Sequence, residues 1–145
     1  MCTSFKGEIL SGVHALGTTV IRAGTGADTL KAALYLASSS QGAGTTAYGV
    51  SGEVSGTGYS AGGVTITNAN PPATSGTTGY WTPSASFTYT TVTLTTAFDA
   101  VLVYNSTQSD KAISVHTFQS QTITAGTFTL TMPTSDATNA LIRIA

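Results

Sequence analysis

Hydrophobic and polar residues alternate along much of the second half of the chain. The alternating stretches are residues 87–89, 92–94, 113–118 and 128–132. Strict alternation predicts strands with one buried and one solvated face, and it is clearest over residues 128–132. Ala100–Tyr104 is a continuous apolar run, which is typical of a strand covered on both faces. The turn-rich residues 105–110 predict a hairpin between this run and residues 112–118.

The first half of the chain gives weaker strand signals. Leu30–Ala37 fits either a helix or a strand by pattern, but flanking glycines and serines favour a strand. Further extended segments are expected at residues 45–50, 64–67 and 141–145. Residues 52–63 are a glycine-rich connection, and residues 68–79, with two prolines, are expected to form a loop. About eight short strands at fairly even spacing predict an all-β sandwich of jelly-roll or immunoglobulin-like topology.

One helical pattern opens the chain, over residues 4–16. Its apolar stripe consists of Phe5, Ile9, Leu10, Val13 and Leu16. Gly17 follows the expected end, and Glu8 and His14, six residues apart, should then point in different directions. A short helix containing two glycines is marginal alone, so it must dock on its own domain or on a neighbouring subunit. We therefore expect a single domain over residues 1–145, with a helical arm (1–17) before a β-sandwich (18–145).

The chain is unusually poor in charge. Charged residues make up 8% of the sequence, against about 25% in typical soluble domains. The five basic residues are scattered, which argues against nucleic-acid binding. No apolar stretch approaches the ~20 residues of a membrane-spanning helix, and we expect no secretory signal at the N-terminus and no membrane partner. A neutral, threonine-rich surface suits a protein that packs against copies of itself or other proteins.

Candidate chemistry is sparse. The segment Gly58-Tyr59-Ser60-Ala61-Gly62 matches the G-x-S-x-G spacing of a nucleophile elbow, and Asp99 and His116 follow in hydrolase order. An elbow, however, joins a strand to a helix, whereas this segment leads into a predicted strand. The same loop lacks the spacing and the following helix of a phosphate-binding loop. With two histidines, one cysteine and dispersed acids, we expect no enzyme activity, no metal and no cofactor.

Aromatic residues offer one alternative function. Tyr59, Tyr80, Trp81 and Tyr89 could stack against a sugar, as aromatic residues do in carbohydrate-binding modules. Packing of these rings in the core is the competing interpretation.

Six segments together resemble a family of small structural proteins of tailed-bacteriophage virions. They are Cys2–His14, Lys31–Tyr35, Thr45–Tyr48, Glu53–Gly63, Tyr104–Thr107 and Pro133–Ala145. The resemblance spans nearly the full length, and none of its segments is a catalytic motif. It implies a component of the phage particle, assembled in the host cytoplasm.

Within that family, the resemblance favours a head decoration (cement) protein that stabilises the shell by binding the major capsid protein. A tail, connector or fibre component, or a carbohydrate-binding host-recognition module, is the alternative. The partner would be the major capsid protein or another virion protein, and the chain is expected to form a homo-oligomer. Partner contacts are predicted at the helical stripe and the glycine-rich loop, namely Phe5, Ile9, Leu10, Val13, Gly56, Gly58 and Tyr59.

Overall fold

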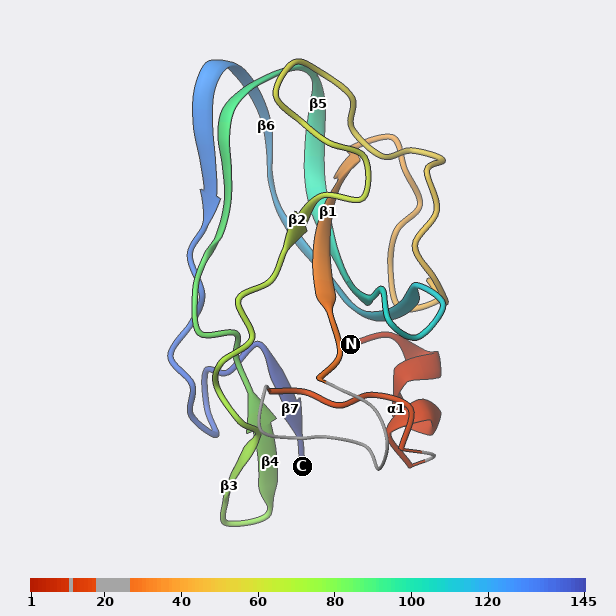
Figure 1. Cartoon of the computed structure of the whole chain (residues 1–145), viewed down its shortest axis with the longest axis vertical. Coiled ribbons are helices and arrows are strands. Elements are labelled where there is room, and N and C mark those ends of the chain that lie inside the picture. Colours follow the sequence, from red (N-terminus) through yellow and green to blue (C-terminus); the bar gives the residue numbers. More distant parts are fainter. Residues whose placement is uncertain (11, 18–26) are drawn as a thin grey trace.

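The structure is a computed structural model that describes residues 1–10, 12–17 and 27–145, without the side chains of residues 7 and 10. One helix and seven strands follow in the order α1 (Thr3–Leu10), β1 (Leu30–Leu36), β2 (Val64–Thr65), β3 (Ala73–Ser75), β4 (Thr78–Trp81), β5 (Phe87–Asn105), β6 (Lys111–Leu130) and β7 (Ile142–Ile144). The strands form two antiparallel sheets, ordered β2-β1-β5-β6 and β3-β4-β7 (Figure 1). The predicted all-β, sandwich-like fold is confirmed.

The sandwich is made largely by one long hairpin, β5–β6, which bends over so that its two halves lie in different layers (Figure 1). Its register shifts cluster at the bend, between Tyr89 and Ala100 on β5. Bulges of this kind bend a strand and increase its twist. Residues from the two halves then meet in the core: the rings of Phe98 and Phe128 lie 5.1 Å apart, and those of Phe118 and Phe128 lie 5.3 Å apart.

The strands are longer and fewer than the alternation suggests. The expected strands at residues 87–89, 92–94 and 100–104 are parts of β5, and those at 113–118 and 128–132 fall largely within β6. The predicted hairpin after Tyr104 is confirmed. Two expectations are wrong. Residues 68–79 are not all loop, because they contain β3 and the start of β4, and residues 45–50 contribute only a bridge from Ala47 to Lys111.

The core lies between the layers and reaches the small sheet. Its largest fully buried side chains include Trp81, Tyr35, Tyr104, Phe5 and Phe98. The presence of Phe5 among them shows that α1 docks on its own domain, where it contacts β6.

Helix α1 ends earlier than predicted, at Leu10 instead of Leu16. The N–H of Gly12 donates to the carbonyl of Ile9 (3.0 Å), and the N–H of Val13 donates to that of Glu8 (2.9 Å). With Gly12 at φ +67°, these bonds form a Schellman cap, which favours glycine at the left-handed position. The chain therefore reverses after Leu10, and His14 returns alongside Glu8.

Candidate functional site

A partly buried polar network ties the N-terminal arm to the β5–β6 turn. The Glu8 carboxylate accepts from His14 Nε2 at 2.8 Å and from Lys111 Nζ at 2.9 Å. Burial alone would raise the pKa of Glu8, but these two bonds outweigh it and lower the pKa below its usual value. The expectation that Glu8 and His14 point apart is therefore wrong, because it assumed a helix through residue 16.

His14 is held at both ring nitrogens. The Thr107 N–H donates to Asn105 Oδ1 (3.1 Å), which turns Asn105 Nδ2 toward Asp28 Oδ2 (2.7 Å) and His14 Nδ1 (3.1 Å). His14 Nδ1 is consequently the acceptor, and the proton lies on Nε2, facing Glu8. The side chain of His14 is fully buried, so this histidine–carboxylate pair helps to hold the arm in place.

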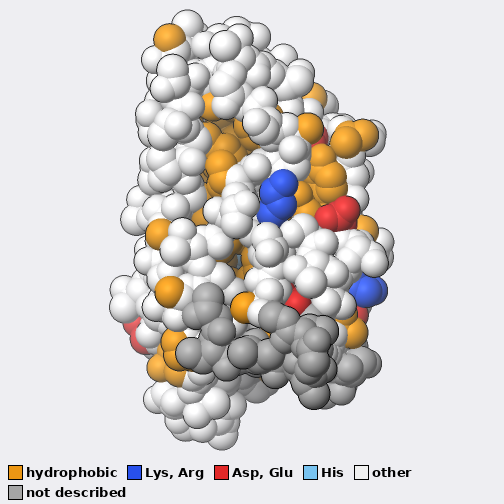
Figure 2. All heavy atoms as spheres, viewed as in Figure 1, with side chains coloured by type: hydrophobic (Ala, Val, Ile, Leu, Met, Phe, Trp, Pro, Cys, Tyr) orange, Lys and Arg blue, Asp and Glu red, His pale blue; other side chains and the backbone are white. Residues whose placement is uncertain are grey.

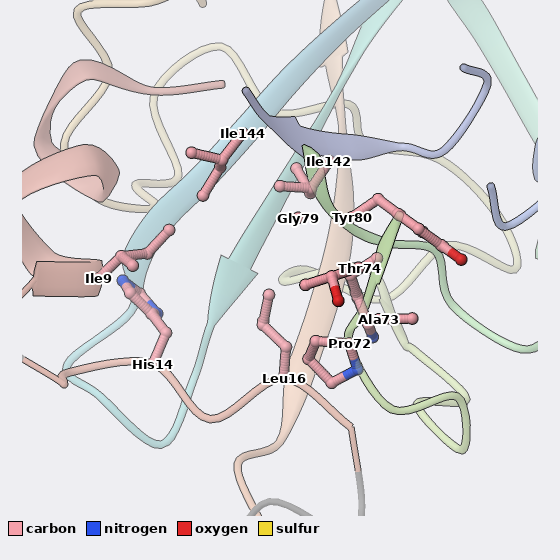
Figure 3. Close-up of a pocket in the computed structure, with 11 residues that line it drawn as sticks. Ile9, His14, Leu16, Pro72, Ala73, Thr74, Gly79, Tyr80, Ile142 and Ile144 are labelled. Atoms are coloured by element: carbon pink, nitrogen blue, oxygen red, sulfur yellow. The ribbon is translucent and has the colours of Figure 1, made fainter. Parts of the chain in front are cut away.

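An apolar pocket of about 300 Å³ opens between the arm and the small sheet (Figure 3). Its walls are Ile9, His14, Leu16, Pro72, Ala73, Thr74, Gly79, Tyr80, Trp81, Ile142 and Ile144. At its rim, Ile144 on β7 is 44% exposed. We call this pocket the terminal groove, because residues near both ends of the chain form it.

The predicted contact stripe on α1 is only partly available. Phe5 is fully buried in the chain's own core, with its ring 4.8 Å from that of His14, so its assignment as a partner contact is wrong. Ile9 is half-buried and lines the terminal groove. Val13 is half-buried. The prediction for Leu10 concerns a side chain outside the described residues.

A second polar network gathers around the carboxylate of Glu53. Oε2 accepts from the Tyr48 hydroxyl (2.7 Å), while Oε1 accepts from the Tyr59 hydroxyl (2.8 Å) and from the Gly62 N–H (2.7 Å). The Tyr59 hydroxyl also accepts from the Leu34 N–H at 3.0 Å. Burial, followed by the bond to Glu53, raises the pKa of Tyr48 and of Tyr59, so both hydroxyls stay protonated and act as donors.

Three more tyrosines complete this network through main-chain carbonyls. The hydroxyls of Tyr104, Tyr89 and Tyr35 donate to Gly62 (2.8 Å), Ala32 (2.8 Å) and Gly49 (2.6 Å), respectively. The rings stack in pairs: Tyr48 lies 4.7 Å from Tyr104, and Tyr59 lies 5.9 Å from Tyr89. The glycine-rich loop is thereby fastened to β1 and β5.

The predicted contacts in that loop face the chain's own sheet. A Cβ on Gly56 would lie 2.0 Å from the Thr93 carbonyl oxygen, and a Cβ on Gly58 would lie 2.3 Å from that of Thr91. Tyr59 directs its hydroxyl into the Glu53 network. These residues are therefore placed to close the loop onto β5. Gly56 and Gly58 are nevertheless exposed, and the partner contact at this loop stays a prediction.

The residues considered for a triad lie in separate surroundings. Ser60 lines a depression with Tyr59 and Thr88. His116 Nε2 pairs with Ser114 Oγ at 2.9 Å and lies in a different, apolar crevice with Met132. Burial lowers the pKa of His116 to about 4, and the N-terminal amine adds a smaller effect in the same direction.

The aromatic residues considered for sugar binding do not form a surface platform. Trp81 is buried, and its Nε1 donates to the Asn70 carbonyl at 3.0 Å. Tyr89 is also buried, and Tyr59 is tied to Glu53. Tyr80 and Trp81 both line the terminal groove.

Sequence reasoning missed the part of the terminal groove supplied by Tyr80, Ile142 and Ile144. The apolar alternation at the C-terminus marks a strand, but the partner of that strand was hidden, because residues 68–79 read as a loop. Glu53 was also missed as an organising centre, since single acids among glycines carry no pattern.

Over residues 1–10, 12–17 and 27–145, no group of three metal-ligating side chains occurs. The same part of the chain contains no helix of the length and hydrophobicity that a bilayer span requires. Fold and site together define an all-β protein with a buried tyrosine network and an apolar surface groove. Comparison with family models, with curated proteins and with solved structures gave no match for this chain.

Proposed function

We propose that the chain is a structural component of a tailed-phage particle, most specifically a head decoration protein that binds the major capsid protein and reinforces the shell. The proposal starts from the sequence resemblance described above. The observation that carries it is the way the fold uses the six segments of that resemblance: four build a scaffold and two build a surface.

The four internal segments meet in the Glu53 network. Tyr35, Tyr48, Glu53, Tyr59 and Tyr104 come from four separate stretches of the chain, and each makes a hydrogen bond within the network. These residues stabilise the fold through stacked rings, protonated hydroxyls and one carboxylate that accepts from three donors. These segments therefore support a rigid building block.

The two terminal segments meet in the terminal groove. Ile9 and His14 belong to the first segment, and Ile142 and Ile144 belong to the last. The groove is apolar, and Met1, 36% exposed, lines an adjoining depression with Ile9 and Ile144. A groove of this kind suits an apolar segment of a partner protein. The occupant we propose is a segment of the major capsid protein.

Low charge supports the same function. Figure 2 shows a face dominated by uncharged side chains, with few charges. Many copies can then lie side by side on a shell without mutual repulsion, and a weak contact is multiplied by the symmetry of the lattice.

Co-sedimentation with undecorated phage heads tests the proposal. The wild-type protein should sediment with the heads, and Ile144→Asp should lower the bound amount about tenfold or more, since it places a charge at an apolar rim. Val50→Asp is the matched control, because Val50 is 72% exposed and lies outside the groove. Absence of binding to heads, or equal binding by both variants, would contradict the proposal.

Copy number separates decoration from the alternative of a tail or connector component. A decoration protein should be present in many copies that scale with the shell lattice, whereas a connector should be present in far fewer. Quantitative mass spectrometry of intact particles measures this number.

A further inference from the structure

The outer edge of β6 is the longest sheet edge in the described structure. The other edge strands are β2, β3 and β7, which have two or three residues, whereas β6 has 20. Among the residues that the structure describes, main-chain hydrogen bonds from other segments cover the beginning of this edge: the carbonyl of Ile113 accepts from the Cys2 N–H (2.9 Å), and the N–H of Ala112 donates to the carbonyl of Thr46 (3.0 Å). Beyond Ile113, β5 is the one described strand that pairs with β6.

This edge lacks most of the devices that prevent strand pairing between molecules. Natural proteins protect sheet edges with charged side chains, prolines or bulges. Residues 112–132 contain no Lys, Arg, Asp, Glu or Pro. The pairing of β6 with β5 shifts register at several places before Phe128, and Ala125 has a φ of +47°. The segment after these irregularities pairs regularly with β5, from Phe128 opposite Tyr89 to Leu130 opposite Phe87.

The last part of the edge is self-complementary. It reads Thr127-Phe128-Thr129-Leu130-Thr131, with the three threonines exposed and the two apolar residues half-buried. Because main-chain groups alternate between the two sides of a strand, every second residue here directs its N–H and C=O away from β5. Reading the segment from either end gives the same order of threonine and apolar positions.

We propose that this segment pairs with the same segment of a second copy of the chain, antiparallel and about a two-fold axis at Thr129. Such pairing places Thr127 opposite the second copy's Thr131 and Phe128 opposite its Leu130. Threonine–threonine and aromatic–aliphatic pairs are both favourable across antiparallel strands. A two-fold contact requires one surface to match itself, and this segment does.

The surroundings of the segment are compatible with a second copy. In Figure 1 the end of β6 lies on the outer flank of the molecule, where no described strand adjoins it on the far side. The segment shares no residue with the terminal groove. The inferred pairing therefore goes beyond the proposed function: a dimer would keep both grooves, and either inference can fail without the other.

Sedimentation equilibrium with charge variants tests the pairing and its register. The wild-type chain should dimerise. Thr127→Lys with Thr131→Lys should raise the dissociation constant about tenfold or more, because like charges then face each other twice. Thr127→Lys with Thr131→Glu should retain the dimer, because each lysine then faces a glutamate.

A substitution one strand away provides the control. Thr88 is exposed and lies opposite Thr129 on β5, on the side of β6 away from the proposed contact. Thr88→Lys should therefore leave the dimer intact, whereas Thr129→Lys should split it. Circular dichroism and thermal unfolding confirm that each variant is folded.

Cross-linking gives a readout that does not depend on weakening the dimer. Thr129→Cys should be joined to itself by a short bifunctional maleimide, while Thr88→Cys should not; the native Cys2 is fully buried. A wild-type chain that is monomeric at every concentration would overturn the proposal. A dimer that survives both Thr127→Lys with Thr131→Lys and Thr129→Lys would also overturn it, because the dimer contact would then lie elsewhere. Pairing of this edge with a capsid protein only would overturn it as well.

Discussion

Glu53 joins several parts of the chain through a single carboxylate. It accepts hydrogen bonds from Tyr48, Tyr59 and the main chain of Gly62, and Tyr59 in turn contacts Leu34. Few residues of this protein carry charge, so the position of this one is informative. The loop scaffold therefore centres on one carboxylate that accepts from three donors.

Replacing this carboxylate with an amide tests that dependence. Glu53→Gln introduces an NH₂ group where three donors converge, so at least one donor loses its acceptor. An unsatisfied buried donor costs about 1–3 kcal/mol, and we expect the free energy of unfolding in urea to fall by that amount. Gln41→Glu, the reverse change at a half-buried position away from the network, serves as a control. Unchanged stability of Glu53→Gln would show that the network contributes nothing.

His116 gives the fold a dependence on pH. Its pKa is about 4 in the folded chain, below the value of about 6.5 expected in the unfolded chain. As the pH falls below 6.5, the unfolded state gains a proton that the folded state does not bind until about pH 4. Stability should therefore decline across this window, by at most about 3 kcal/mol.

His116→Gln should remove this part of the pH dependence while keeping a partner for Ser114. The measurement is the free energy of unfolding at pH 7 and at pH 4.5 for both proteins. The wild type should lose more stability between the two values than the variant. Parallel declines would mean that His116 titrates normally in the folded chain.

Among the elements, the N-terminal helix shows best what the sequence predicts and what it hides. The apolar stripe predicts where the helix begins, and the structure agrees within a residue. Its end depends on the left-handed conformation of Gly12, whereas the apolar residues Val13 and Leu16 continue the helical spacing beyond it. Gly12 is the available signal, but a glycine within an unbroken apolar stripe does not stand out as a cap.

The sequence also predicts some features of the strands and hides others. Flanking glycines and serines locate β1, whereas alternation locates the regular parts of β5 and β6, because one face of each must be buried. Alternation does not show that the short runs join into one bent hairpin, because bulges interrupt it between one run and the next. The terminal groove stays hidden for a related reason, since β3 follows Pro71 and Pro72 and is joined to β4 through Gly76, residues that favour turns.

Gly12→Ala tests the reversal that brings His14 to Glu8. A Cβ at this position meets no atom within 4 Å, so the cost comes from φ +67° alone. We expect a loss of about 1 kcal/mol in the free energy of unfolding. Gly42→Ala is matched to it, with equally open space and no such φ, and should be neutral or slightly stabilising. Equal effects at the two sites would contradict the cap.

Gly56→Ala tests whether the glycine-rich loop is closed onto β5. The added Cβ would lie 2.0 Å from a main-chain oxygen, which cannot move without displacing the strand. A loss of more than about 2 kcal/mol is expected from the forced shift. Gly44→Ala, where nothing lies within 4 Å, should have little effect in the same denaturation assay. A tolerated Gly56→Ala would mean that the loop lies away from the sheet.

In the molecule as a whole, the two polar networks and the terminal groove have different roles. The Glu53 network fastens the glycine-rich loop, and the Glu8–His14–Asn105 network fastens the arm, which forms part of the wall of the terminal groove. A protein that reinforces a shell needs a fixed shape and a surface for one partner. The described structure has both.

Electron cryomicroscopy of undecorated heads incubated with the purified protein tests the central proposal most directly. We expect ordered density at repeated positions on the outside of the shell, with the end of the molecule that carries Ile9 and Ile144 against the major capsid protein. Bare shells, or density confined to the tail, would contradict it.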